Sequence, residues 1–86
     1  MHDLIASNRI ILSKNYRSGQ VFLIEIPGDM LAVLGYRHIE EEPIYSRAFF
    51  YNDENRKKVE KNARKHFNLI KEYFYQKKLH LLDEVE

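Results

Sequence analysis

The segment from about residue 53 to residue 79 is the longest stretch of the chain with a helical hydrophobic period, and everything else must fold around it. At about 100° per residue its apolar side chains fall within one arc: Val59, Ala63, Phe67, Ile70, Tyr73 and Phe74. Asn52 is a good N-cap, and Asp53 and Glu54 place negative charge where a first helical turn favours it. The pattern predicts one amphipathic helix over about 53–79, followed by a short tail at 80–86.

The opposite side of this helix is basic. Its exposed positions are predicted to hold Lys57, Lys61, Arg64, Lys65 and Lys71, with Asn68 and Tyr75 among them. Residues 53–78 contain nine lysines and arginines against four acids, whereas the remainder has five bases and nine acids, so a net charge of +1 hides two oppositely charged regions. This side is either an ordinary solvated helix face or a surface that contacts a partner.

The helix is long for its own domain. About 27 residues at 1.5 Å each extend roughly 40 Å, whereas a compact chain of 86 residues has a diameter of roughly 30 Å. The helix therefore bends or frays near Gln76, or its end rests on a second copy of the chain. The apolar tail residues Leu79, Leu81, Leu82 and Val85 would suit such docking, and a frayed terminus is the alternative.

The residues before the helix read as short strands. Met1 to Ser7 fits a short helical turn or an arm, and a first strand centres on Ile10–Leu12. Gln20–Ile26 is a second strand, with Phe22, Ile24 and Ile26 on one face and Val21, Leu23 and Glu25 on the other. Pro27-Gly28 predicts a turn.

The segment from Met30 to His38 is ambiguous. The preceding turn favours a returning strand with a bulge at Gly35, which we choose, although a short capped helix over 29–35 also fits. With a last strand at Ile44–Tyr51, the expected fold is α+β: an antiparallel meander of three to four strands over about 9–51, then one long C-terminal amphipathic helix (ββββα).

The last strand carries a row of aromatic residues. If Ile44, Ala48 and Phe50 face the helix, then Tyr45, Arg47, Phe49 and Tyr51 stand on the uncovered face of the sheet. We expect such an open row to contact a partner. A homodimer that packs sheet to sheet would bury it, and stacked nucleic-acid bases are the alternative occupant.

Composition limits the remaining choices. Eighty-six residues with 44% hydrophobic and 31% charged positions predict a single domain, 1–86. The absence of cysteine excludes a disulfide scaffold, a thiolate zinc site and a cysteine nucleophile. No signal-peptide pattern and no apolar run of membrane-spanning length occurs, so we expect a cytoplasmic protein that binds no membrane.

Motifs of known chemistry do not occur. There is no nucleophile elbow, phosphate-binding glycine loop or HExxH sequence, and the histidines at positions 2, 38, 66 and 80 lack ligand spacing. We therefore predict no enzyme, no catalytic or metal residues, no cofactor and no small-molecule ligand. His66 lies in the apolar arc, where a hydrogen-bonded core histidine is expected. A metal-independent ribonuclease built from His, Tyr and Arg is a minor alternative.

Two functions fit these features. The first is a small non-catalytic interaction or regulatory protein, homodimeric, that binds a macromolecular partner through the aromatic sheet face and the basic helix. The alternative is a single-stranded nucleic-acid-binding protein that stacks bases on the aromatic row and contacts phosphates through Lys57, Lys61, Arg64 and Lys71. The predicted partner-binding residues are Tyr45, Arg47, Phe49, Tyr51, Lys57, Lys61, Arg64, Lys71 and Tyr75.

Overall fold

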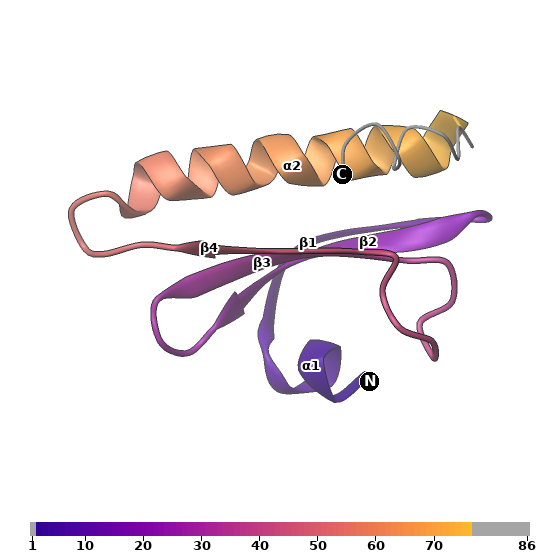
Figure 1. Cartoon of the computed structure of the whole chain (residues 1–86), viewed down its shortest axis with the longest axis horizontal. Coiled ribbons are helices and arrows are strands. Elements are labelled where there is room, and N and C mark those ends of the chain that lie inside the picture. The colour runs from indigo at the N-terminus through magenta and orange to yellow at the C-terminus, as the bar shows by residue number, and fades with distance from the viewer. Residues whose placement is uncertain (1, 77–86) are drawn as a thin grey trace.

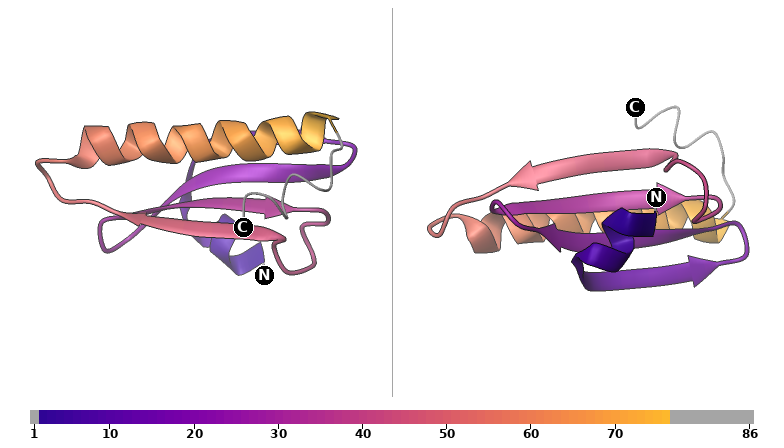
Figure 2. Two further views of the ribbon diagram at one scale, coloured as in Figure 1. Left: turned by 45° about the horizontal axis from the view of Figure 1, so that its top comes forward. Right: turned by 90° about the horizontal axis from the view of Figure 1, so that it is seen from below.

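Six secondary-structure elements make up the computed structural model, which describes residues 2–76, with the backbone alone for residues 2–4. In chain order they are α1 (His2–Ser7), β1 (Arg9–Tyr16), β2 (Gly19–Ile26), β3 (Met30–Tyr36), β4 (Tyr45–Phe50) and α2 (Arg56–Gln76). The four strands form one antiparallel sheet in the order β1-β2-β3-β4. Helix α2 runs along one face of this sheet and α1 lies on the other (Figures 1 and 2). The predicted ββββα arrangement is confirmed.

The segment that was ambiguous in sequence, residues 30–38, contains strand β3, but the prediction of a bulge at Gly35 is wrong. Gly35 pairs in regular register with both neighbouring strands, and the register shift of the sheet lies instead between Ile10 and Leu12 in β1. A Cβ atom at Gly35 would lie 3.0 Å from Cγ2 of Ile70 and 3.3 Å from Cε2 of Phe74. Glycine therefore lets α2 approach the sheet closely at this point.

The core has two parts, one on each face of the sheet. Between the sheet and α2 lie buried residues from β2, β3, β4 and the helix: Val21, Leu23, Leu31, Val33, Tyr45, Phe49, Ala63, Phe67, Ile70, Tyr73 and Phe74. On the other face a smaller cluster comprises Phe22, Ile24, Ala32, Leu34 and Tyr36. The predicted buried arc of the helix is thus confirmed, although Val59 is only partly buried.

The predicted orientation of β4 is wrong. Tyr45 and Phe49 are each only 8% exposed and pack under α2, and Tyr51 is partly buried against the same cluster. Phe50, expected to face the helix, is 70% exposed on the opposite face, where Ala48 is exposed too. The aromatic row is therefore not an open surface.

Strand pairing explains this reversal. Phe49 pairs with Leu31 and Tyr45 pairs with Gly35, and paired residues of an antiparallel sheet share a face. Leu31 and Val33 lie in the core under α2, so Tyr45, Arg47 and Phe49 must point to that side. Both faces of this segment contain apolar residues, so alternation alone could not assign them.

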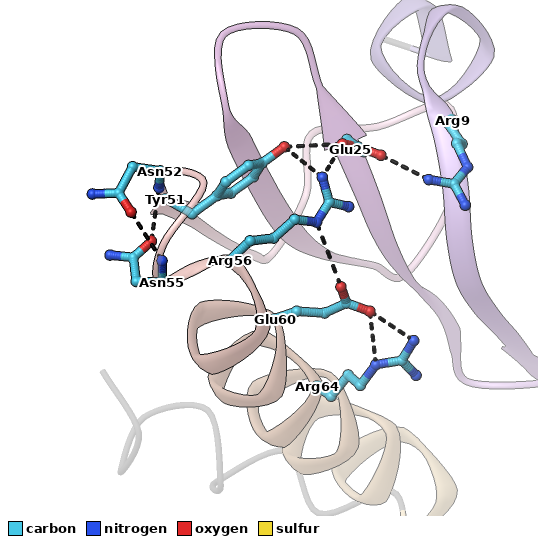
Figure 3. A network of polar contacts seen from close by, with 8 residues as sticks. All are labelled: Arg9, Glu25, Tyr51, Asn52, Asn55, Arg56, Glu60 and Arg64. Carbon is cyan, nitrogen blue, oxygen red and sulfur yellow. Dashed lines mark hydrogen bonds and ion pairs between the residues drawn. The ribbon is translucent and has the colours of Figure 1, made fainter.

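Helix α2 begins at Arg56, three residues after the predicted start. The Asn52 side chain accepts hydrogen bonds from the N–H groups of Glu54 (3.0 Å) and Asn55 (2.9 Å), and the Asn55 side chain accepts one from the Asn52 N–H (2.7 Å; Figure 3). These bonds close a turn over 53–55. The first helical bond runs from the Val59 N–H to the Asn55 carbonyl (2.9 Å), so Asn55 is the N-cap.

The described part of α2 contains 21 residues and extends about 32 Å. The predicted continuation to residue 79, and the docking of the tail, lie outside the described residues. Within residues 2–76, no helix is both long enough and apolar enough to cross a membrane.

Candidate functional site: the lysine face of helix α2

A polar network joins the sheet to the start of α2 (Figure 3). Glu25 of β2 accepts hydrogen bonds from Arg9 (2.7 Å), from Arg56 (2.9 Å) and from the Tyr51 hydroxyl (2.9 Å). The bonds from Arg56 and Tyr51, with a smaller effect of Arg9, lower the pKa of Glu25 to about 2. Glu25 is thus a carboxylate whose charge is already balanced by two arginines.

Glu60 is balanced in the same way. It is the only acidic residue between Arg56 and Lys71 in the sequence. Arg64, one helical turn later, donates two hydrogen bonds to its Oε2 atom, at 3.0 and 3.3 Å, while Nε of Arg56 lies 3.8 Å from its Oε1 atom. Glu25 and Glu60 are therefore both taken by arginines, and neither is left for a lysine. The exposed Asp53 and Glu54, just before the helix, form no ion pair within residues 2–76 either.

Four lysines in the first half of α2 remain without an acidic partner. We call Lys57, Lys58, Lys61 and Lys65 the lysine face. All four are exposed, and none forms an ion pair with any residue from 2 to 76. They fall within an arc of about 100° and span about 12 Å along the axis. The positive end of the helix dipole adds to the potential at Lys57 and Lys58, which lie in the first turn. This surface can bind a run of negative charges.

The structure gives the predicted helix residues four different environments. Lys57 and Lys61 belong to the lysine face. Arg64 is paired with Glu60, and Lys71 is half-buried. Tyr75 is 68% exposed, and its ring lies edge-on against Tyr16, with 6.0 Å between centroids.

Two members of the lysine face, Lys58 and Lys65, were not among the predicted partner-binding residues. The spacing of four residues from Glu60 to Arg56 and to Arg64 would have shown that these arginines are occupied. The same spacing would also pair Asp53 with Lys57 and Glu54 with Lys58, and only the structure shows that neither pair forms within residues 2–76.

The predicted stacking residues do not form a platform for bases. Tyr45 and Phe49 are buried under α2, and the Tyr51 hydroxyl is bound to Glu25, with the Arg56 guanidinium 4.8 Å from the centre of its ring. Of the four, only Arg47 remains exposed.

A second polar cluster lies on the flank of α2 that faces β4. Nδ1 of His66 is hydrogen-bonded to the Tyr45 hydroxyl at 3.0 Å, and its ring lies 5.1 Å from that of Phe49, over which Arg47 sits at 5.8 Å. Burial, and then the charge of Arg47, lower the pKa of His66, so its imidazole is neutral at pH 7. No three His, Asp or Glu side chains converge as metal ligands in the described part of the chain.

Comparison of the chain with protein-family models, with curated proteins and with solved structures gives no match. The geometry and charge of the lysine face are therefore the basis on which a function can be proposed.

Proposed function

We propose that the chain is a non-catalytic binding module that docks its lysine face onto a polyanionic macromolecule. The supporting observation is the uneven distribution of charge at the start of α2: Glu25 and Glu60 are held by arginines, while four neighbouring lysines have no carboxylate partner within residues 2–76. Like charges this close repel one another, and a bound polyanion relieves that repulsion.

The backbone of a nucleic acid is the polyanion that this surface fits best. Duplex DNA carries about one charge per 1.7 Å of its axis, so the lysine face would lie beside several phosphates. Lysine ammonium groups bind phosphates as point charges and read no base sequence. Because Tyr45 and Phe49 are buried, their rings are not accessible for stacking against the bases of a single strand. We therefore propose binding through phosphates alone.

A fluorescence-anisotropy titration tests this proposal. The chain is titrated at low salt against labelled duplex and single-stranded oligonucleotides, with an acidic peptide such as polyglutamate as competitor. We expect micromolar binding of the duplex without sequence preference, and a log–log dependence of affinity on salt with a slope of about −3 to −4, since four phosphates are neutralised.

A charge-matched pair of variants locates the surface. Changing Lys57, Lys61 and Lys65 together to Gln should weaken binding at least tenfold. In the control variant, the exposed residues Lys14, Arg17 and Arg37 are changed to Gln, which removes the same amount of charge. The Arg17–Ser18 turn lies at the other end of α2, where Ser18 is bonded to the Phe74 carbonyl. This variant should bind as the wild type does. No binding in the tens of micromolar would refute the proposal, and binding of the acidic peptide alone would indicate an acidic protein partner.

A metal-independent ribonuclease is a second candidate, because the fold brings Tyr45 and Arg47 of β4 close to His66 of α2, the helix that carries the lysine face. A neutral His66 would take the proton of an RNA 2′-hydroxyl as its oxygen attacks the adjacent phosphorus. Arg47 would stabilise the added charge, and the leaving oxygen would take a proton from solvent. Incubation with a fluorescent RNA tests this: cleavage that is lost in His66→Ala and retained in His38→Ala would support it, and intact RNA would exclude it.

A further inference from the structure

The two edges of the sheet differ in how they are protected against pairing with another strand. Strand β1 carries a register shift between Ile10 and Leu12 and the charged side chains of Arg9 and Lys14. Such bulges and charges are what natural proteins place on edges that must stay free. Strand β4 pairs with β3 without any register shift and has a single charged residue, Arg47. The β4 edge is therefore the less protected of the two.

The backbone of β4 offers hydrogen-bonding groups along this edge. The Tyr51 N–H donates to the Asp29 carbonyl at 3.0 Å, in the same register that pairs Phe49 with Leu31. Because N–H and C=O groups alternate in direction along a strand, the odd-numbered residues bond to β3. The groups of Ser46, Ala48 and Phe50 then point away from β3, towards the edge with which no strand of residues 2–76 pairs.

The side chains at these three positions suit close approach of another strand. Ser46 and Ala48 are small, and all three are exposed on the face opposite α2. Phe50, at 70%, is the most exposed large apolar side chain in the described part of the chain. Covering it removes apolar surface from water.

We propose that β4 pairs antiparallel with β4 of a second copy, about a two-fold axis at Ala48. In this register Ala48 lies opposite the partner's Ala48, and Phe50 lies opposite the partner's Ser46, so each outward N–H meets an outward carbonyl. Each large ring faces a small residue. Arg47 lies opposite the partner's Phe49, which keeps the two arginines from facing each other directly. The edge is thus complementary to itself, which a two-fold dimer requires.

The dimer has a consequence that rests on the proposed function. A two-fold axis between paired antiparallel strands is perpendicular to the sheet, so both α2 helices lie on the same face of one continuous sheet. The two lysine faces then contact one polyanion together, and the second contact is intramolecular, which strengthens binding without any new kind of contact.

The oligomeric state is the first test. Sedimentation equilibrium at high micromolar concentration should give twice the chain mass of 10.4 kDa. Ala48→Pro removes an N–H that points away from β3, and proline is tolerated on edge strands, so this variant should be a folded monomer. Phe50→Ser, at an exposed position, should weaken dimerisation at least tenfold. The matched control Ile10→Ser changes the 45% exposed apolar residue on the β1 edge and should leave the dimer intact.

Cross-linking tests the register. The chain has no cysteine, so Ala48→Cys introduces a single thiol. Residues opposite each other in a hydrogen-bonded antiparallel pair have Cα atoms about 5.5 Å apart, which is within disulfide range. Mild oxidation should therefore link two copies through position 48, whereas Ser13→Cys on the β1 edge should stay largely unlinked.

These measurements separate the dimer from the proposed function. A wild-type chain that is monomeric at high micromolar concentration overturns the inference, as does a dimer that survives Ala48→Pro and fails to cross-link through position 48. A dimer that forms but binds no nucleic acid leaves the inference standing and refutes the proposed function. If both hold, Ala48→Pro should bind a long duplex at least tenfold more weakly than the wild type.

Discussion

Nη1 of Arg56 lies 2.9 Å from Oε2 of Glu25, and this ion pair joins the first turn of α2 to strand β2. The same arginine donates a hydrogen bond to the Tyr51 hydroxyl at 3.1 Å, and Arg9 of β1 forms a second ion pair with Glu25 (Figure 3). Four elements or their connections therefore meet at one carboxylate. This junction fixes where α2 starts above the sheet and how its lysine face is presented.

Glu25→Gln should lower the free energy of unfolding by about 1–2 kcal/mol at pH 7, since it weakens three charge-assisted hydrogen bonds, two of them from partly exposed arginines. Because the folded-state pKa of Glu25 is about 2 and its ordinary value is 4.5, the unfolded chain takes up the proton first as the pH falls. The wild type should lose this stability between about pH 4.5 and pH 2.

Urea unfolding at several pH values measures both effects. In Glu25→Gln, the loss of unfolding free energy that titration of Glu25 causes between about pH 4.5 and pH 2 should be absent. Glu41→Gln, an exposed residue of the loop before β4, makes the same change of charge and should behave as the wild type. Equal acid dependence in wild type and Glu25→Gln would disprove the role of the junction.

The free energy of unfolding should also depend on the protonation of His66, at higher pH. Burial and the charge of Arg47 lower its pKa below the ordinary value of 6.5. The unfolded chain therefore binds a proton more readily than the folded chain, and stability is lost as the pH falls below about 6.5. Urea unfolding is measured between pH 7.5 and pH 5.5, a range of about two units around 6.5. The unfolding free energy of the wild type and of His38→Gln should fall over this range, and that of His66→Gln should fall less.

Two buried tyrosines should respond in opposite ways to loss of their hydroxyl groups. The Tyr45 hydroxyl is bonded to His66, whereas the Tyr73 hydroxyl is buried and has no hydrogen-bond partner within residues 2–76. Tyr45→Phe should lower the free energy of unfolding by about 1 kcal/mol, and Tyr73→Phe should leave it unchanged or raise it by up to about 1 kcal/mol. Thermal unfolding of the two variants measures these changes. Equal losses of unfolding free energy would contradict the finding that, of the two, only the Tyr45 hydroxyl is hydrogen-bonded within residues 2–76.

Gly35 predicts a packing effect. Its added Cβ would lie 3.0 Å from Cγ2 of Ile70, so Gly35→Ala should push α2 from the sheet and cost about 1–3 kcal/mol. Ile70→Leu removes the branched methyl that would be hit, so the double variant should lose less than the sum of the two single changes. Strict additivity of the three free energies of unfolding would show that the two residues do not touch.

Local patterns predicted most of the secondary structure. The buried arc of α2, including Ala63, Phe67 and Ile70, follows from a helical period maintained over several turns. The Pro27-Gly28 turn follows from backbone chemistry, and Gly28 does have a positive φ of 101°. The predicted start of α2 was wrong because Asn52 forms a turn that competes with the helix, and the true N-cap, three residues later, is also an asparagine.

The sequence by itself determined the order of the strands and helix and the basic side of α2, since these depend on residues close together in the chain. Only the tertiary structure decided which face of β4 is buried, because both faces are apolar and pairing with Leu31 and Gly35 sets the choice. It also decided which cations are free. Arg56 is neutralised by Glu25, 31 positions away in sequence, and a contact at that separation exists only once β2 and α2 are packed together.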